Sequence, residues 1–137
     1  MTTKIAEASS IMSKPNKLEI LRELMQEENV DTFLIPRADC YQGEFISARD
    51  ARLAWLTGFT GSAGLCIVSL KDVALFVDGR YSIQAEKEKN NKDIQILRFE
   101  QKVIIEWFKI NLKSSSVIGF DPWLHTIKEI ETFKKEL

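Results

Sequence analysis

The chain has 137 residues, of which 45% are hydrophobic, and its 19 Lys and Arg nearly balance its 20 Asp and Glu. This length is typical of one compact domain with a sizeable core. A net charge of -1 provides no broad electrostatic attraction to nucleic acid or to an anionic membrane, so we expect neither as a partner.

The cysteine content and the N-terminal sequence indicate where in the cell the protein is expected. Cys40 and Cys66 form neither a CxxC pair nor the dense framework of a secreted disulfide protein, and we expect both to be reduced thiols. The N-terminal stretch MTTKIAEASSIMSKPNK holds no apolar run of signal-peptide length, and no segment approaches the roughly 20 apolar residues that span a bilayer. A soluble cytoplasmic protein is therefore expected.

The first predicted elements follow a leader of small and polar residues, 1–15, which we expect to be flexible. Helical periodicity over 16–28 predicts an amphipathic helix. Its expected apolar side is formed by Leu18, Ile20, Leu21, Leu24 and Met25. A buried strand is predicted over 30–35 and ends at Pro36, because proline has no N–H for a sheet ladder. The polar stretch 37–50 is predicted to be a loop.

The middle of the chain combines irregular backbone with a hairpin. Segment 51–64 is expected to lack regular structure because it contains three glycines, Gly58, Gly61 and Gly64. Two β-rich runs, 65–70 and 73–77, are separated by two residues and predict an antiparallel hairpin. Residues 78–79 end the second strand, and 80–89 have the composition of a surface helix.

The last part of the chain alternates strand and helix. A strand is predicted over 94–97, a helix over 103–108 and a strand over 117–120. Thr126 and Glu129 match a capping box, in which each side chain satisfies a backbone N–H at the helix start. The apolar stripe expected on this final helix consists of Ile127, Ile130, Phe133 and Leu137.

Together these elements predict an α/β fold over 16–137. We expect a mixed five- to six-stranded sheet that contains an antiparallel hairpin and is flanked by helices. The chain has no internal repeat and no low-complexity tract. In α/β folds, loops at the ends of strands tend to carry function, which directs attention to two segments.

The first segment is GFTGSAG, 58–64, since glycines let a ligand approach the backbone closely. Its GxxGxxG spacing differs from that of the GxGxxG and GxxxxGK[ST] nucleotide loops, and it precedes a predicted strand rather than a helix. A tight structural loop is the favoured interpretation, and nucleotide binding is the alternative.

The second segment is DGRY, 78–81, where a strand becomes a helix. Asp78 can cap that helix, Gly79 can form the turn and Arg80 can pair with a nearby carboxylate, so spacing alone favours a structural role. His125 is the only histidine and is predicted to be a surface or capping residue. A single histidine excludes sites that need two, such as HExxH.

Four blocks of sequence, in this order, carry a family resemblance. They are DxxQxEFI at 39–46, RLxWLTGFTGSAG at 52–64, DGRYxxQA at 78–85 and GFDP at 119–122. Four blocks in order are much more specific than one motif. The chain from Leu18 to Leu137 resembles the start of the large, cytosolic form of the Xaa-Pro aminopeptidases (aminopeptidase P) in the creatinase/prolidase family.

This resemblance implies an N-terminal, non-catalytic domain with a mixed sheet. In the large form, a second such domain and a pita-bread catalytic domain follow, both outside this chain. There, two Asp, one His and two Glu hold two divalent ions, commonly manganese. A bridging water attacks peptides with proline in the second position. None of the five ligand motifs occurs in these 137 residues, so the resemblance implies no catalytic and no metal-ligating residue here, and no activity of this chain alone.

The role implied for the chain is to pack against its own catalytic domain, to limit access of proline-containing peptides to the cleft, and to support a homodimer. The matching blocks nominate five cleft-facing residues, Gly58, Phe59, Gly61, Ser62 and Arg80. Two residues depart from the family pattern, Thr60 at an often acidic position and His125 in a usually apolar segment. The alternative is a non-catalytic module that binds peptides or proteins with the same fold.

Overall fold

The computed structural model describes residues 16–37, 52–61, 63–113, 115–121, 125 and 127–137. The predictions for 1–15, for most of the loop 37–50, and for Cys40, Ser62 and Thr126 lie outside this part of the chain. The elements follow in the order α2 (Lys17–Glu27), β1 (Thr32–Pro36), α3 (Arg52–Thr57), β2 (Gly64–Ser69), β3 (Val73–Val77), η1 (Gly79–Tyr81), α4 (Ser82–Glu88), β4 (Gln95–Arg98), α5 (Gln101–Asn111), β5 (Ile118–Phe120) and α6 (Ile127–Glu136).

The strands form a five-stranded sheet in the order β4-β3-β2-β1-β5. β2 pairs antiparallel with β1 and β3, whereas β1–β5 and β3–β4 are parallel pairs. The predicted mixed sheet and its hairpin are therefore confirmed. The hairpin turn is closed by Ser69, whose Oγ accepts a hydrogen bond from Asp72 N at 2.8 Å. Because β2 alone is reversed, the carboxyl ends of β1, β3, β4 and β5 lie at one edge of the sheet.

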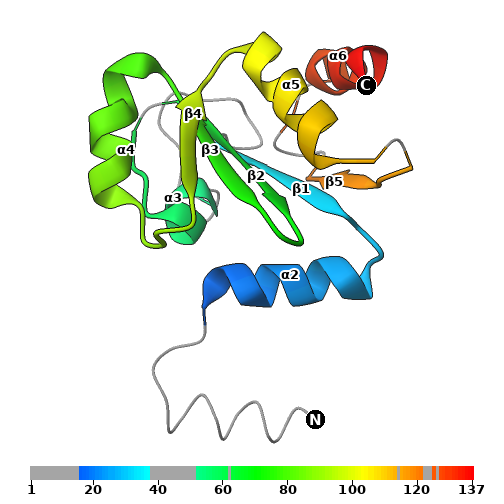
Figure 1. Cartoon of the computed structure of the whole chain (residues 1–137), viewed down its shortest axis with the longest axis horizontal. Coiled ribbons are helices and arrows are strands. Elements are labelled where there is room, and N and C mark those ends of the chain that lie inside the picture. The colour runs from blue at the N-terminus through cyan, green and yellow to red at the C-terminus, as the bar shows by residue number, and fades with distance from the viewer. Residues whose placement is uncertain (1–15, 38–51, 62, 114, 122–124, 126) are drawn as a thin grey trace, which may run out of the picture.

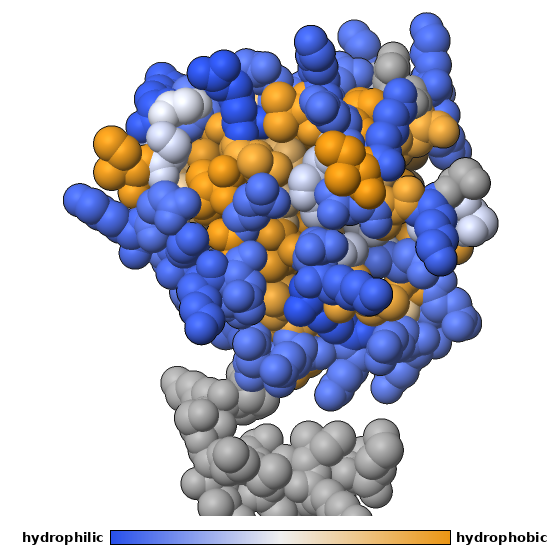
Figure 2. Space-filling view, in the orientation of Figure 1, coloured by the Kyte–Doolittle hydropathy of each residue, from blue (hydrophilic) through white to orange (hydrophobic). Residues whose placement is uncertain are grey.

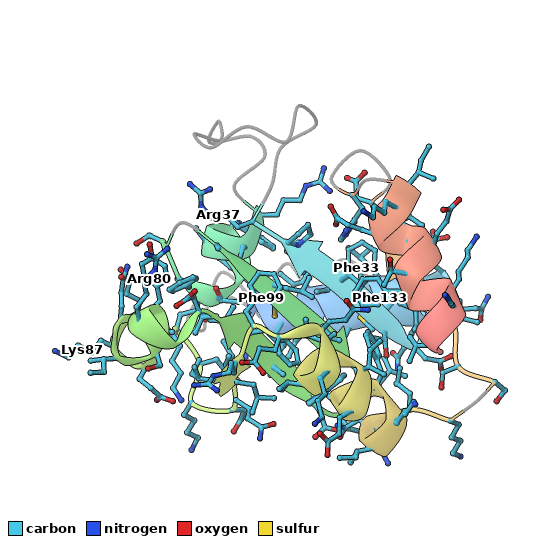
Figure 3. The ribbon with its side chains drawn as sticks, turned by 90° about the horizontal axis from the view of Figure 1, so that it is seen from above. Phe33, Arg37, Arg80, Lys87, Phe99 and Phe133 are labelled. Atoms are coloured by element: carbon cyan, nitrogen blue, oxygen red, sulfur yellow. The ribbon has the colours of Figure 1, made fainter. Side chains whose placement is uncertain are left out.

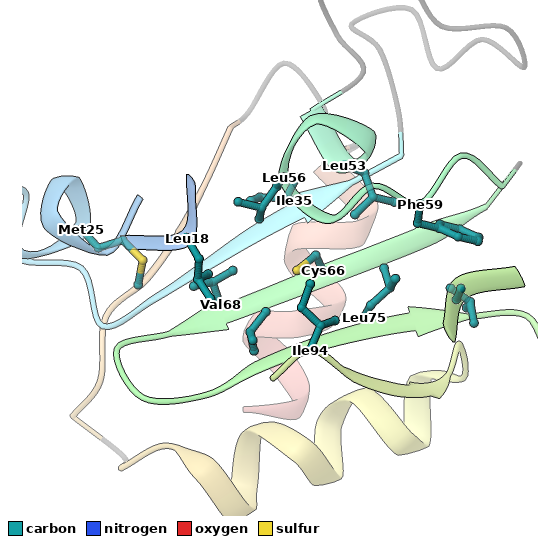
Figure 4. Packing of buried hydrophobic residues seen from close by; sticks show 13 residues of the cluster. Leu18, Met25, Ile35, Leu53, Leu56, Phe59, Cys66, Val68, Leu75 and Ile94 are labelled. Carbon is teal, nitrogen blue, oxygen red and sulfur yellow. The ribbon is translucent and has the colours of Figure 1, made fainter. Parts of the chain in front are cut away.

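Helices cover both faces of the sheet, with α2 below it and α5 and α6 above it in Figure 1. Strand side chains alternate between the faces, as the pleat requires. Cys66 and Val68 pack in a cluster with α2, α3 and α4, part of which Figure 4 shows. Leu65 and Ile67 pack in a second cluster with α5. Burial raises the pKa of the Cys66 thiol to about 12, so this thiol is neutral and inert.

The apolar side of α2 is narrower than predicted. Leu18 and Met25 are buried, whereas Ile20 is 38% and Leu24 is 52% exposed. At about 100° per residue, Ile20 and Leu24 lie roughly 200° and 240° around the helix from Leu18, on its far side. The helix itself begins as expected from a polar cap, since Asn16 Oδ1 accepts from Leu18 N at 2.9 Å.

Three other predictions are corrected. Arg52–Thr57 forms the short helix α3, where irregular backbone was expected, because Leu53 and Leu56 pack into the core. Ile127 is 79% exposed, outside the stripe that packs on the sheet. His125 is not a surface residue, because its side chain is 2% exposed. Its Nδ1 lies 3.2 Å from Glu129 Oε2, and its ring packs edge-on against Phe120.

Candidate functional site

The DGRY turn lies at the carboxyl end of β3. Asp78 Oδ1 accepts a hydrogen bond from Arg80 N at 3.1 Å, which confirms the predicted cap. Arg80 Nε lies 3.8 Å from the same oxygen, and the guanidinium carbon lies 5.1 Å from the centroid of the Tyr81 ring. The Arg80 side chain is 72% exposed, so this ion pair contributes little to stability and the charge faces solvent.

The glycine loop, residues 58–61, connects α3 to the start of β2. Gly58 N donates to Ala54 O at 2.8 Å, and Gly58 has a φ of 86°. A Cβ on Gly58 would lie 2.4 Å from Glu88 O. A Cβ on Gly61 would lie 2.1 Å from Phe59 Cζ. Both glycines are therefore required by close packing, which agrees with a structural loop.

Of the five predicted cleft-facing residues, Arg80 is the one whose side chain the structure describes as exposed. Phe59 is 1% exposed, and its ring meets Tyr81 in a T-shaped contact at 6.1 Å between centroids. Phe59 therefore anchors the glycine loop from inside the core, and its cleft-facing role stays a prediction. Gly61 is buried, Gly58 is half-buried, and Ser62 lies outside the described residues.

Sequence reasoning missed Glu88 at the end of α4, which joins the glycine loop to α4. Its carboxylate accepts hydrogen bonds from Thr60 N at 2.9 Å, from Thr60 Oγ1 at 2.9 Å and from Gln84 Nε2 at 3.1 Å. We call these three residues, Thr60, Gln84 and Glu88, the carboxylate clamp. No local motif could have revealed the clamp, because 28 residues separate its two ends.

The electrostatics of the clamp favour ionised Glu88. The Thr60 backbone N–H is the main cause that lowers the pKa of the Glu88 carboxyl below its ordinary value of 4.5. Desolvation opposes this shift, and the Thr60 hydroxyl and the Gln84 amide add to it. Hydrogen bonds to a charged acceptor are stronger than those to a neutral one. The clamp is therefore fully formed at neutral pH.

Acidification is expected to weaken the fold through Glu88. Because its pKa is lower in the folded chain than in the unfolded chain, ionised Glu88 stabilises the fold above the ordinary carboxyl range, and this contribution is lost as pH falls below about 4.5. Urea unfolding at pH 7 and pH 3 should show a smaller loss of stability for Glu88→Gln than for the wild type. Glu86→Gln on the same helix is the control, and an identical loss in wild type and Glu88→Gln would contradict the assignment.

The loop and the turn lie at the edge of the sheet where several strands end. Figure 3 labels Arg37, Arg80 and Phe99, which follow β1, β3 and β4. Arg37 N donates to Gly64 O at 3.0 Å, which ties the end of β1 to the start of β2. Ligands of open α/β sheets bind outside the carboxyl ends of the strands, so this edge is the candidate functional surface.

A pocket of about 370 Å³ opens near this edge, between α5 and α6. Its apolar lining is formed by Pro36, Leu65, Phe99, Ile104 and Phe133, and polar side chains including Lys128 and Glu129 complete it. Its volume and apolar lining are within the range of ligand pockets.

Among the described residues, no group of three or more His, Cys, Asp or Glu could hold a metal ion. Among the helices that the structure describes, none has both the length and the apolar character needed to cross a bilayer. The glycine loop also leads into β2 rather than into a helix, so it lacks the helix N-terminus of a nucleotide loop.

The sequence and fold of the chain match a known family of proteins. The family model described as the Creatinase/Prolidase N-terminal domain matches residues 17–137, and the chain belongs to this family. A probable Xaa-Pro aminopeptidase P of Coccidioides posadasii is 44% identical over 115 residues, which are 82% of this chain and 19% of the relative. Human Xaa-Pro aminopeptidase 2 is 33% identical over 124 residues, covering 90% of this chain and 18% of the relative.

Solved structures agree with this assignment. X-prolyl aminopeptidase from Caenorhabditis elegans, described as a cytosolic enzyme with a di-nuclear active site, superposes with a TM-score of 0.70 at 31% identity. The match covers 77% of this chain and 18% of that protein. The N-terminal domain of the cytoplasmic peptidase PepQ from Mycobacterium tuberculosis shares the fold, with a TM-score of 0.65 at 21% identity over 88% of this chain and 83% of that domain. The chain thus spans about a fifth of the length of the Xaa-Pro aminopeptidases that it matches.

Proposed function

We propose that this chain is the N-terminal accessory domain of a metal-dependent Xaa-Pro aminopeptidase, which releases the N-terminal residue from peptides with proline in second position. The observation that carries the proposal is the match of residues 17–137 to the N-terminal domain family, together with Xaa-Pro aminopeptidase relatives up to 44% identical.

In this proposal the domain packs beside the catalytic cleft and limits which peptides enter it. Figure 2 shows hydrophobic side chains across the middle of the face that carries α4, β4 and α5. Phe99, which follows β4, is 41% exposed. Apolar surface bounded by charged side chains is typical of an interface, which supports packing against another part of a longer protein or against a second copy in a homodimer.

The chemistry would be supplied by two divalent ions, manganese in this proposal, held in the catalytic domain. Two adjacent metal ions activate a water and stabilise the oxyanion that forms when the peptide bond is attacked. The C. elegans relative, a cytosolic enzyme with a di-nuclear active site, supports both the metal pair and a cytoplasmic location.

The proposal is tested by assaying manganese-dependent release of the N-terminal residue from an Arg-Pro-Pro peptide. This 137-residue chain and a longer protein that carries it are measured side by side. Activity is expected only in the longer protein and is expected to disappear with EDTA and return with Mn²⁺. Activity of the chain alone, or of the longer protein after complete metal removal, would overturn the assignment.

Arg80 is proposed to offer a fixed positive charge to the substrate or to an acidic group across the domain interface. Arg80→Ala in the longer enzyme is expected to lower kcat/KM about tenfold, which corresponds to the loss of one charge-assisted hydrogen bond, with little loss of stability. The control is Lys87→Ala, because Lys87 points away from the body of the domain in Figure 3. Equal kinetics for both variants would remove Arg80 from the site.

The alternative function is a non-catalytic module that binds peptides or proteins. The observation that favours it is the apolar pocket between α5 and α6. Absence of peptidase activity from both the chain and the longer protein, with saturable binding of a proline-containing peptide to the chain, would support this alternative.

A further inference from the structure

The exposed tip of the glycine loop is held by side chains from another element. Phe59 lies in the core on one side of the tip, and Gly61 is buried on the other. Thr60 between them is exposed, and both its backbone N–H and its hydroxyl donate to Glu88. The position of Thr60 therefore depends on a carboxylate at the end of α4 and not only on the backbone of the loop.

The charged turn lies directly before this helix. Arg80 in η1 precedes Gln84 and Glu88 by four and eight residues, and Gln84 Nε2 bonds to the Glu88 carboxylate at 3.1 Å. A second link runs through the aromatic contact between Phe59 and Tyr81. The glycine loop is thus connected twice, to the turn through the contact of Phe59 with Tyr81 and to α4 through the carboxylate clamp.

A third contact fixes the base of the loop. Asn90, just beyond α4, donates its backbone N–H to Thr57 O at 2.9 Å and its side-chain amide to Leu56 O at 3.0 Å. These bonds hold the end of α3 against the end of α4 without reaching Thr60. Loss of the clamp should therefore release the loop tip while the base of the loop and the core stay in place.

Resting on the function proposed above, we propose that Glu88 is a positioning residue that holds Thr60 in fixed register with the Arg80 turn and so sets the shape of the surface this domain presents to the substrate cleft. The chemistry of the clamp explains the choice of residue. Three N–H and O–H donors point at Glu88, and a carboxylate offers two acceptor oxygens with no competing donor. An alanine at position 88 offers none.

The first measurement is hydrogen exchange of the Thr60 amide by NMR in the 137-residue chain. Glu88→Ala is expected to speed exchange of this amide about tenfold, as loss of a hydrogen bond to a charged acceptor predicts. Glu86→Ala is the matched control, because it makes the same substitution on the same helix and removes an ion pair with Lys89 that does not involve Thr60. Unchanged exchange of Thr60 in Glu88→Ala would overturn the proposal whatever the peptidase does.

The second measurement is steady-state kinetics of the longer enzyme on the Arg-Pro-Pro peptide. Glu88→Ala is expected to raise KM several-fold with little change in kcat, since a misplaced surface loses ground-state and transition-state binding alike. Thr60→Val should reproduce part of this rise, and Thr60→Ser, which keeps the hydroxyl, should restore the wild-type KM. Loss of folded protein would instead lower the apparent kcat and leave KM unchanged.

The outcomes separate the two proposals. A wild-type enzyme without metal-dependent peptidase activity removes the proposed function and, with it, the role of Glu88. An active wild type whose KM is unaffected by Glu88→Ala, despite faster exchange of Thr60, leaves the peptidase assignment standing and removes the positioning role alone.

Discussion

Phe59→Ala is expected to lower the free energy of unfolding by about 3 to 5 kcal/mol, the range found for removing a large buried aromatic side chain. Phe59 is 1% exposed, fills the space beside Gly61 and contacts the Tyr81 ring in a T-shaped arrangement. Truncation of Phe59 to alanine leaves a cavity between Gly61 and Tyr81. Urea unfolding of the 137-residue chain, followed by tryptophan fluorescence and circular dichroism, measures the effect.

The control for Phe59→Ala is Trp55→Ala in the neighbouring helix. Trp55 is 52% exposed, and Lys17 Nζ lies 5.0 Å from its ring centroid. An exposed cation–π contact is worth about 0.5–1 kcal/mol, so Trp55→Ala should lower the free energy of unfolding only slightly. Because this variant lacks one tryptophan, its unfolding is followed by circular dichroism. If Phe59→Ala left the stability unchanged but weakened peptide binding by the longer enzyme, the result would support the cleft-facing role that the motif predicts for Phe59.

Gly58→Ala is expected to cost more than about 2 kcal/mol of unfolding free energy, through two effects that add. A φ of 86° lies in the left-handed region, which costs an L-residue roughly 1–2 kcal/mol. The new Cβ would also lie 2.4 Å from the backbone oxygen of Glu88, which moves only if α4 moves. The expected result is a lower urea midpoint with an unchanged m-value.

Gly79→Ala is the matched control for this change. Gly79 does not have a positive φ, and a Cβ there meets nothing within 4 Å. Its replacement should leave stability within about 0.5 kcal/mol of the wild type or raise it slightly, by restricting the unfolded chain. Equal destabilisation by both substitutions would show that the contact of Gly58 with Glu88 is not what the loop requires.

The hairpin and α5 illustrate what local pattern predicts well. β2 and β3 are two β-rich runs joined by a short polar turn, and their pairing follows from the turn itself. In α5, Ile104, Trp107 and Phe108 recur at helical spacing and all are buried. The backbone hydrogen bonds of such elements form within the element or with the next strand, so residues close together in the sequence are sufficient to predict them.

Packing that no periodic pattern encodes explains the predictions that were wrong. His125 is buried because its ring packs against Phe120 of β5 and its Nδ1 bonds to Glu129 of α6, and neither contact leaves a periodic trace in the sequence. α3 is too short for helical periodicity to stand out, and its stability comes from burying Leu53 and Leu56. In both cases tertiary packing outweighs local preference.

By itself the sequence determined the fold class, the hairpin and the family, because periodicity, turn residues and motif order are properties of neighbours along the chain. The burial and the contacts of the candidate residues depended on the tertiary structure. It placed Phe59 in the core, made Gly58 necessary through Glu88 O and brought the Glu88 carboxylate to Thr60 across 28 residues. The physical reason is that burial and hydrogen bonding depend on which atoms meet in space, and Thr60 and Glu88 meet although 28 residues separate them along the chain.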